Sequence, residues 1–110
     1  MNDWIWCGYP HHFVGAHKCH FSLATFVAGG RFLVSTIGDW RPTDDETTEP
    51  LGIDGHTYET MVFATNPEDL IDGEPNLVSW SELRCLGALT PASASEQHLL
   101  MCYEYSEVDA

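Results

Sequence analysis

Two runs rich in β-branched and aromatic residues, joined by a short glycine-containing turn, constrain the fold of this chain most. The run FSLATFV is followed by AGG and then by RFLVSTIGDW. Val, Ile, Thr and Phe favour extended strands, and glycine accepts the backbone angles of a tight turn. The pattern therefore predicts a β-hairpin over about residues 21–40, against which the rest of the chain has to pack.

Further strands are predicted on both sides of this hairpin. The segment HTYETMVFA alternates with the period of a strand and places Tyr58, Thr60 and Val62 on one face. The segment DWIWCG alternates in the same way and places Trp4 and Trp6 on one face. The segment LVSWSELRCLG fits either a fourth strand or a short helix, and its pattern does not decide between them.

The segment TPASASEQHLLMCYEYSEV is predicted to be a helix from about residue 94 to residue 107. Pro91 fits a first turn, and Ser93 and Glu96 have the spacing of a capping box. The chain of 110 residues is expected to be a single domain, 1–110, with an α+β fold. In this fold a small antiparallel sheet is built on the hairpin and the C-terminal helix packs on it. Residues with helical spacing are Leu99, Cys102, Tyr103 and Ser106.

Composition indicates a globular protein of the cytoplasm. Apolar residues make up 44% of the chain, but no run of about 18 apolar residues is present, so we expect no membrane span. The first residues, MNDWIWCGYP, include an acid and lack the basic start of a signal peptide. In the cytoplasm, thiols or metal ligands are more common than disulfides. This expectation applies to Cys7, Cys19, Cys85 and Cys102.

Charge is the most unusual property of the sequence. Four Lys and Arg stand against seventeen Asp and Glu, a formal net charge of −13, and no Lys or Arg lies between Arg41 and Arg84. Direct binding to a nucleic-acid backbone is therefore not expected. The acidity serves either solubility or the binding of a basic partner that ordinarily binds phosphates. The predicted partner-binding residues are Asp44, Asp45, Glu46, Glu49, Asp54, Glu68, Asp69, Asp72 and Glu74.

One possible structural zinc site joins two distant segments. His98 and Cys102 are four residues apart on the predicted helix, which places an imidazole and a thiolate on one face. The histidine-rich segment HHFVGAHKCH offers the other two ligands, for which Cys19 and His12 are the first choices. Alternatively, the two cysteines and His98 are core residues without a metal. The histidines that compete with His12 are His11, His17 and His20.

Two kinds of catalytic site are alternatives to a structural zinc site. Cys19 has His17 and His20 close in sequence, and an imidazole activates a thiolate, but neighbouring residues of a strand point to opposite faces. Metal-dependent hydrolysis needs an open coordination position and a base such as Glu59. Neither spacing singles out a catalytic centre, so we expect no enzyme.

Several short motifs resemble those of small proteins encoded in tailed-bacteriophage genomes. They are WIW at the start, HF followed by CHF, VSTIG at the end of the hairpin, YETMVF and a late HLLMC. The resemblance implies phage origin and action in the cytoplasm of an infected bacterium. It implies no activity. It favours the zinc prediction, because His12, Cys19, His98 and Cys102 all lie inside these motifs.

Together these features favour a small acidic phage protein that binds and inhibits a host complex. The expected target is a defence or nucleic-acid-binding complex, such as a CRISPR effector or a restriction enzyme, with the acidic segment 43–74 acting as a nucleic-acid mimic. A zinc-stabilised structural or adaptor protein is the alternative, and a small metal-dependent hydrolase is the third. The tryptophans form either core contacts or a partner-binding patch: Trp4, Trp6, Trp40 and Trp80.

Overall fold

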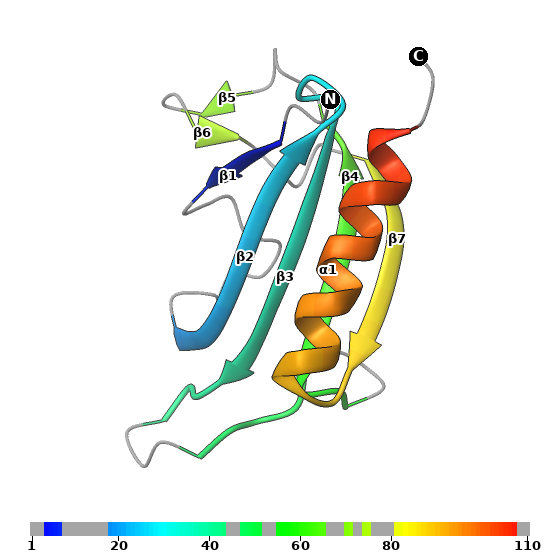
Figure 1. Cartoon of the computed structure of the whole chain (residues 1–110). Coiled ribbons are helices and arrows are strands. Elements are labelled where there is room, and N and C mark those ends of the chain that lie inside the picture. The colour runs from blue at the N-terminus through cyan, green and yellow to red at the C-terminus, as the bar shows by residue number, and fades with distance from the viewer. Residues whose placement is uncertain are drawn as a thin grey trace.

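The computed structural model describes residues 4–7, 18–43, 47–51, 55–65, 70–71, 74–75 and 81–107. These ranges form a five-stranded antiparallel sheet, a separate two-stranded pair and one helix (Figure 1). The expected α+β fold, an antiparallel sheet with the C-terminal helix packed on it, is confirmed. The elements are β1 (Ile5–Cys7), β2 (Cys19–Val27), β3 (Phe32–Trp40), β4 (Tyr58–Ala64), β5 (Leu70–Ile71), β6 (Glu74–Pro75), β7 (Ser81–Ala88) and α1 (Pro91–Ser106).

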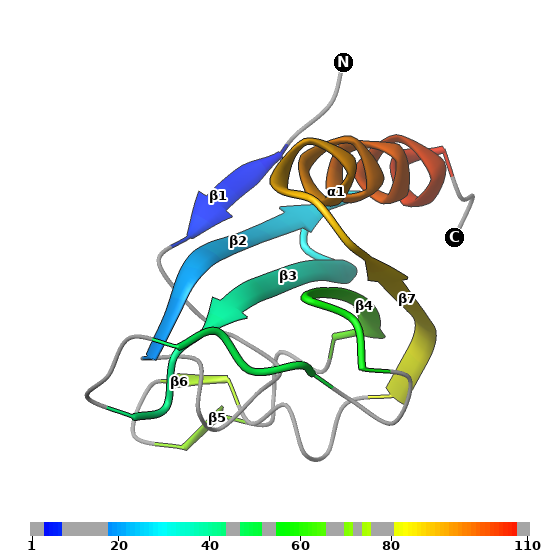
Figure 2. The same cartoon turned by 90° about the horizontal axis from the view of Figure 1, so that it is seen from below.

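The strands of the main sheet follow the order β1-β2-β3-β4-β7. Helix α1 lies across one face of this sheet and contacts β2, β3, β4 and β7. The β5–β6 pair lies on the other side of the sheet from α1 (Figure 2). The long hairpin of β2 and β3 is therefore central, as the sequence predicts, and the helix has one face toward the sheet and one face away from it.

The predicted hairpin over residues 21–40 is confirmed and begins slightly earlier, because β2 starts at Cys19. The last pair of the ladder, Val27 opposite Phe32, closes the turn. Gly29 and Gly30 have φ angles of 67° and 89° in this turn. Glycine accepts such left-handed angles without the clash that a side chain would cause. The sequence AGG therefore provides the backbone freedom that the turn needs.

The strands beyond the hairpin follow the predicted alternation. Tyr58, Thr60 and Val62 of β4 are buried on the face that α1 covers. From Ser81 on, the ambiguous segment before the helix is a strand, β7, which pairs with β4 along its length, and its first part, including Trp80, lies outside the described residues. The local pattern of β7 did not decide its conformation, because that conformation depends on pairing with β4, whose residues lie 17 to 30 positions earlier in the sequence.

The start of α1 differs from the prediction by one turn. Thr90, not Ser93, is the N-cap: its hydroxyl accepts a hydrogen bond from the Ser93 backbone N–H at 3.1 Å. The Thr90 backbone N–H donates to the Ser93 hydroxyl in return, which completes a capping box. The expected box of Ser93 and Glu96 is therefore wrong. Pro91 explains the difference, because it fits the first helical position and holds the residue before it in an extended conformation.

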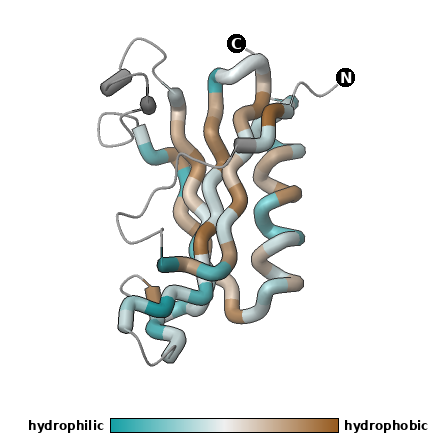
Figure 3. Tube along the Cα trace, turned by 90° about the vertical axis from the view of Figure 1, so that its left-hand side faces the viewer, coloured by the Kyte–Doolittle hydropathy of each residue, from teal (hydrophilic) through white to brown (hydrophobic). Residues whose placement is uncertain are grey.

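The buried face of α1 also differs from the predicted stripe. The buried residues are Ala94, His98, Met101 and Cys102. Among the residues singled out by spacing, Cys102 is buried, whereas Leu99 and Tyr103 are exposed. Figure 3 shows α1 beside the sheet, with hydrophobic and hydrophilic residues alternating along its length. The helix thus carries apolar side chains on two faces, of which the sheet covers one.

Both faces of the sheet contain buried residues. Under α1, the side chains of Val27, Val34 and Val62 pack against Met101 and Cys102. On the opposite face, the buried residues Ala24, Leu33 and Phe63 form a second cluster. Burial on both faces fixes the register of the strands, since a shift by one residue would exchange the two sets of side chains.

Candidate functional site

His98, a predicted zinc ligand, is fully buried between α1 and the sheet. Its Nδ1 atom lies 2.7 Å from the hydroxyl oxygen of Thr36, and its Nε2 atom lies 2.9 Å from that of Thr25. Thr36 in turn lies 2.7 Å from the Thr60 hydroxyl. Both ring nitrogens of the histidine therefore have hydrogen-bond partners on the two central strands β2 and β3.

The direction of each hydrogen bond in this network can be assigned by starting from Gln97, which lies at one end of the network. The side-chain nitrogen of Gln97 only donates, and it lies 3.1 Å from the Thr60 hydroxyl oxygen. Thr60 then donates to Thr36, and Thr36 donates to Nδ1 of His98. The proton of the neutral ring is consequently on Nε2, which donates to Thr25. In this order every hydroxyl proton between Gln97 and His98 has an acceptor.

Burial also determines the charge of His98 and of Cys102, which is linked to the same network through Thr25. It lowers the pKa of His98 to about 4, because the buried site disfavours the charged imidazolium. It raises the pKa of Cys102 to about 11, although a hydrogen bond from Thr25 partly opposes the effect. At neutral pH the imidazole and the thiol are both uncharged. The arrangement is that of a satisfied polar network inside a core, with neither a free nucleophile nor a free base.

The predicted zinc ligands are only partly brought together. His98 and Cys102 share the network through Thr25, but Cys19 lies six residues away from Thr25 on β2, about 20 Å along the strand. His12, with its competitors His11 and His17, lies outside the described residues, and His20 is exposed on β2 beside Cys19.

The described residues include three of the four predicted ligands of the zinc clamp: Cys19, His98 and Cys102. A zinc ion on His98 would have to displace Thr25 or Thr36 from the ring. Within the described ranges, no three His, Cys, Asp or Glu side chains are grouped so as to hold a metal ion. Zinc binding therefore stays a prediction, and no step of the proposed function depends on it.

The structure does not bring the residues of the two catalytic alternatives together. Cys19 and His20 are consecutive on β2, so their side chains point to opposite faces of the sheet. Burial also raises the pKa of the Cys19 thiol to about 11. Glu59 alternates with Tyr58 and Thr60, so it lies on the face of β4 opposite the one that α1 covers. The carboxylate proposed as a base is thus across the sheet from the His98 network.

The predicted acidic partner-binding residues lie mostly outside the described ranges. Glu49 is described: it forms a bridge with Trp40 at the end of β3, where its backbone N–H donates to the Trp40 carbonyl at 2.7 Å. Glu74 is part of β6. The bridge at Glu49 ties the acidic segment to the sheet. Outside the described residues are Asp44, Asp45, Glu46, Asp54, Glu68, Asp69 and Asp72.

All four basic side chains of the protein make contacts within the chain. Arg41 binds both carboxylate oxygens of Asp39, at 2.9 and 2.8 Å, and this contact lowers the pKa of Asp39. Arg84 forms an ion pair with Glu104 at 2.9 Å. The remaining two donate to backbone carbonyls, Lys18 to Pro42 and Arg31 to Ala28. Most of the carboxylates therefore have no basic side chain of this protein to neutralise them.

A second surface lies on α1 and β1, and Trp6 is the one residue of it that the sequence marked as a possible member of a partner-binding patch. Leu99, Leu100 and Tyr103 of α1 are 40%, 56% and 54% exposed, and Trp6 of β1 is 50% exposed. We call these four residues the apolar patch. The signal for it was present in the sequence: residues 99–102 are four consecutive apolar residues that span about one helical turn, so they cannot all face the same sheet.

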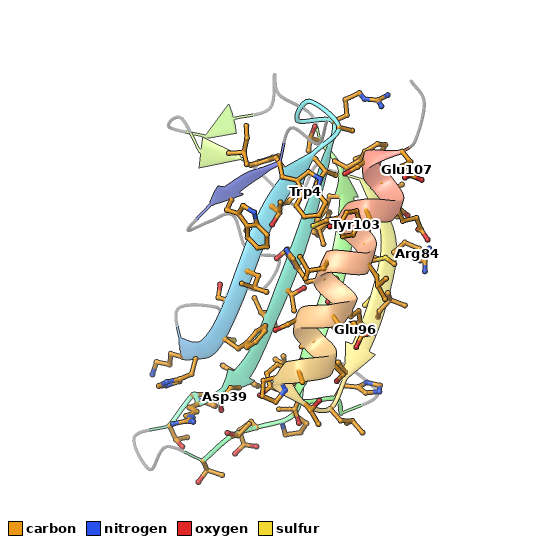
Figure 4. The ribbon with its side chains drawn as sticks, in the orientation of Figure 1. Trp4, Asp39, Arg84, Glu96, Tyr103 and Glu107 are labelled. Atoms are coloured by element: carbon orange, nitrogen blue, oxygen red, sulfur yellow. The ribbon has the colours of Figure 1, made fainter. Side chains whose placement is uncertain are left out.

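Aromatic contacts hold the apolar patch in place. The ring of Trp4 lies edge-on to that of Tyr103, with centroids 4.8 Å apart, and it also contacts Trp6 at 6.4 Å. The indole N–H of Trp4 donates to the Ser106 hydroxyl at 2.6 Å. Trp6 covers the buried ring of His98 at 5.4 Å. Figure 4 shows Trp4 and Tyr103 next to each other between β1 and α1.

Comparisons with protein-family models, with curated proteins and with solved structures find no match for this chain. Among the described residues, no helix is both long enough and apolar enough to cross a membrane. Function is therefore inferred from the charge and the surfaces of the molecule itself.

Proposed function

We propose that this protein binds a nucleic-acid-binding complex of a bacterial host and inhibits it by covering its basic surface. In this proposal it is a product of a tailed phage and acts in the cytoplasm of the infected cell. One observation carries the proposal. The net charge is −13, and each of the four basic side chains is already engaged within the chain, so the acidic character of the surface is not locally neutralised.

A net charge of this size lowers the stability of a small domain, since like charges repel one another in the folded state. The same charge attracts a basic groove over a distance of about 10 Å at moderate salt and accelerates association. A protein that presents carboxylates competes with the phosphates that such a groove ordinarily binds. CRISPR effectors and restriction enzymes have grooves of this kind, which makes inhibition of host defence the specific form of the proposal.

The acidic segment 43–74 includes the sheet strand β4, so we expect the acidic residues on either side of β4 to enter the groove. The segment contains no Lys or Arg. It leaves the sheet at the end of β3, where the bridge of Trp40 with Glu49 ties it back to the sheet, and a second bridge joins Leu51 to His56 within the segment. Leu51 is buried against Ile37, so this part of the segment has a fixed attachment to the sheet.

The proposal is tested by capture from a lysate of the bacterial host, followed by a competition assay. The immobilised protein should retain nucleic-acid-binding proteins, which a rising salt gradient elutes, and it should displace duplex DNA from them. The triple variant Asp44→Lys, Asp45→Lys, Glu46→Lys should weaken this competition at least about tenfold. The double variant Thr43→Ser, Thr47→Ser alters the same segment without changing its charge and should compete normally. Retention that is insensitive to salt and to the charge reversal would refute the proposal.

A further inference from the structure

The four side chains of the apolar patch remain exposed to solvent, whereas other apolar side chains of the protein are buried against the sheet. Burying such side chains is favourable, and a contiguous exposed apolar surface rimmed by polar residues marks interaction sites. Two members of the apolar patch, Trp6 and Tyr103, belong to the residue types that contribute most to protein interfaces. The composition of the patch is therefore that of an interface core.

The patch is also preorganised. Trp4 contacts both Trp6 and Tyr103, and its indole is fixed by the hydrogen bond to Ser106. The helix that carries the leucines starts at a complete capping box. Side chains that are already ordered lose less entropy on binding, so more of the contact energy appears as affinity.

Charge around the patch determines what can cover it. Glu96, Leu100 and Tyr103 are spaced by four and three residues and thus form one stripe along α1, and the C-cap Glu107 follows four residues after Tyr103. Figure 4 shows Glu96 and Glu107 toward opposite ends of the helix, with Tyr103 between them. The helix contains no basic residue that would neutralise them. A covering partner therefore meets an apolar centre between two negative ends.

The position of Glu107 strengthens this reading. It is the C-cap of α1, and the last turn contains no basic residue. A negative charge at the C-terminus of a helix opposes the helix dipole, so the carboxylate is kept there at a cost to stability. A cation supplied by a partner would remove that cost.

Two other occupants are disfavoured by the same charges. A second copy of the chain would bring a net charge of −13 against −13 and set glutamates beside glutamates. An anionic membrane surface repels the protein for the same reason.

We propose that the apolar patch, with Glu96 and Glu107, binds a basic amphipathic helix of a partner protein, whose apolar side chains cover the patch and whose Lys or Arg side chains reach the two glutamates. This inference rests on the proposed function in that it assigns the patch to the same basic target. Helix-in-groove binding of this kind reads its partner through apolar side chains at helical spacing, with flanking charges setting the orientation.

The test uses the full chain and a synthetic 18-residue helical peptide of Leu and Lys with one apolar face, labelled for fluorescence anisotropy. A scrambled peptide of the same composition is the control for charge alone. We expect the amphipathic peptide to bind at least about tenfold more tightly than the scrambled one. The variant Leu100→Ser, Tyr103→Ser should remove that preference, and Glu96→Lys, Glu107→Lys should weaken binding at least about tenfold.

Glu82→Lys is the matched control, because Glu82 is an exposed glutamate on the edge strand β7 and does not belong to the patch. It should change the affinity less than about twofold, and circular dichroism should show all variants folded. Equal binding of the two peptides, or unchanged binding by both patch variants, would overturn the inference. So would a concentration-dependent dimer that the Leu100→Ser, Tyr103→Ser variant abolishes, because the occupant would then be a second copy.

Failure of the proposed function gives a different pattern. If the peptide binds the patch but the lysate yields no nucleic-acid-binding protein, the patch inference holds and the inhibitor proposal fails. If captured complexes are inhibited normally by both patch variants and the peptide shows no preference, the inhibitor proposal holds and the patch inference fails.

Discussion

The Nδ1 atom of His98 lies 2.7 Å from the hydroxyl oxygen of Thr36, in a fully buried contact between α1 and the central strand β3. This hydrogen bond joins residues 62 positions apart in the sequence. Together with the bond from Nε2 to Thr25, it anchors the helix to two strands through one side chain. A residue that resembles a metal ligand in the sequence is thus a polar link between helix and sheet.

The first prediction concerns this link. His98→Phe should lower the free energy of unfolding by about 2–6 kcal/mol, because it removes the ring partners of two buried hydroxyls and each such loss costs about 1–3 kcal/mol. Urea denaturation followed by tryptophan fluorescence measures the change. His98→Gln, which keeps a donor and an acceptor, should lose less than half as much. Equal stability of His98→Phe and the original protein would show that the bonds contribute nothing net.

The second prediction is a pH dependence with a defined sign. The pKa of His98 is lowered from 6.5 to about 4 in the folded state, so the unfolded chain binds more protons between these two values. Stability should therefore be fully present above about pH 6.5 and fall as the pH decreases toward 4. The loss should be about 2 kcal/mol near pH 5, at about 1.4 kcal/mol for each pKa unit.

Carboxylates also take up protons in this pH range, which reduces the repulsion between negative charges and changes the stability. The effect of His98 is therefore measured as the difference in stability between the original protein and His98→Gln. We expect the stability gap between the original protein and His98→Gln to shrink as the pH falls from about 6.5 to 4. Asp39, whose pKa Arg41 lowers from 3.8, loses its stabilisation only below this range. A gap that stays constant with pH would contradict the assignment to His98.

The third prediction concerns the close approach of two strands. A Cβ atom at Gly38 of β3 would overlap the ring of Tyr58 in β4. Gly38→Ala should therefore destabilise the protein by about 1–3 kcal/mol, as overpacking does in other cores. The double variant Gly38→Ala, Tyr58→Leu should recover part of the loss in the same denaturation assay, since the smaller side chain makes room. An additive loss in the double variant would place the cause elsewhere.

The fourth prediction addresses zinc. Because both nitrogens of His98 already have hydrogen-bond partners, we expect a chelator to change the melting temperature by less than about 1 °C. Elemental analysis of the purified protein and melting with and without EDTA make the measurement, with Cys102→Ser and Cys19→Ser as variants. One equivalent of zinc whose removal unfolds the protein would instead support the clamp of His12, Cys19, His98 and Cys102.

Much of the fold followed from local patterns, and the exceptions have identifiable causes. The hairpin and β4 were predictable because their side chains alternate between two buried faces. The helix start was misplaced because Ser93 has acceptable spacing both to Thr90 and to Glu96, and Pro91 decides in favour of the former. The conformation of β7 depends on pairing with β4, which no local pattern records.

The candidate site was less accessible from the sequence. The partners of His98 are threonines on β2 and β3, and a threonine in a strand is ordinary, so nothing marked Thr25 and Thr36 as hydrogen-bond acceptors or donors for a distant histidine. Helical spacing grouped Leu99 and Tyr103 with Cys102, but Cys102 is buried and the other two are exposed. The buried face of α1 includes the polar residue His98, whereas Leu99 and Leu100 are exposed.

The last prediction follows from the position of Glu107 at the end of α1. Glu107→Lys should raise the free energy of unfolding by about 0.3–1 kcal/mol, because it replaces an unfavourable charge at the helix C-terminus with a favourable one. Glu107→Gln should give an intermediate gain, and added salt should reduce both gains by screening. Urea denaturation at low and high salt measures them. Glu107→Lys should also weaken binding of the basic peptide, because the carboxylate that lowers stability contributes to affinity. A loss of stability in Glu107→Lys would contradict the unfavourable interaction of Glu107 with the helix dipole.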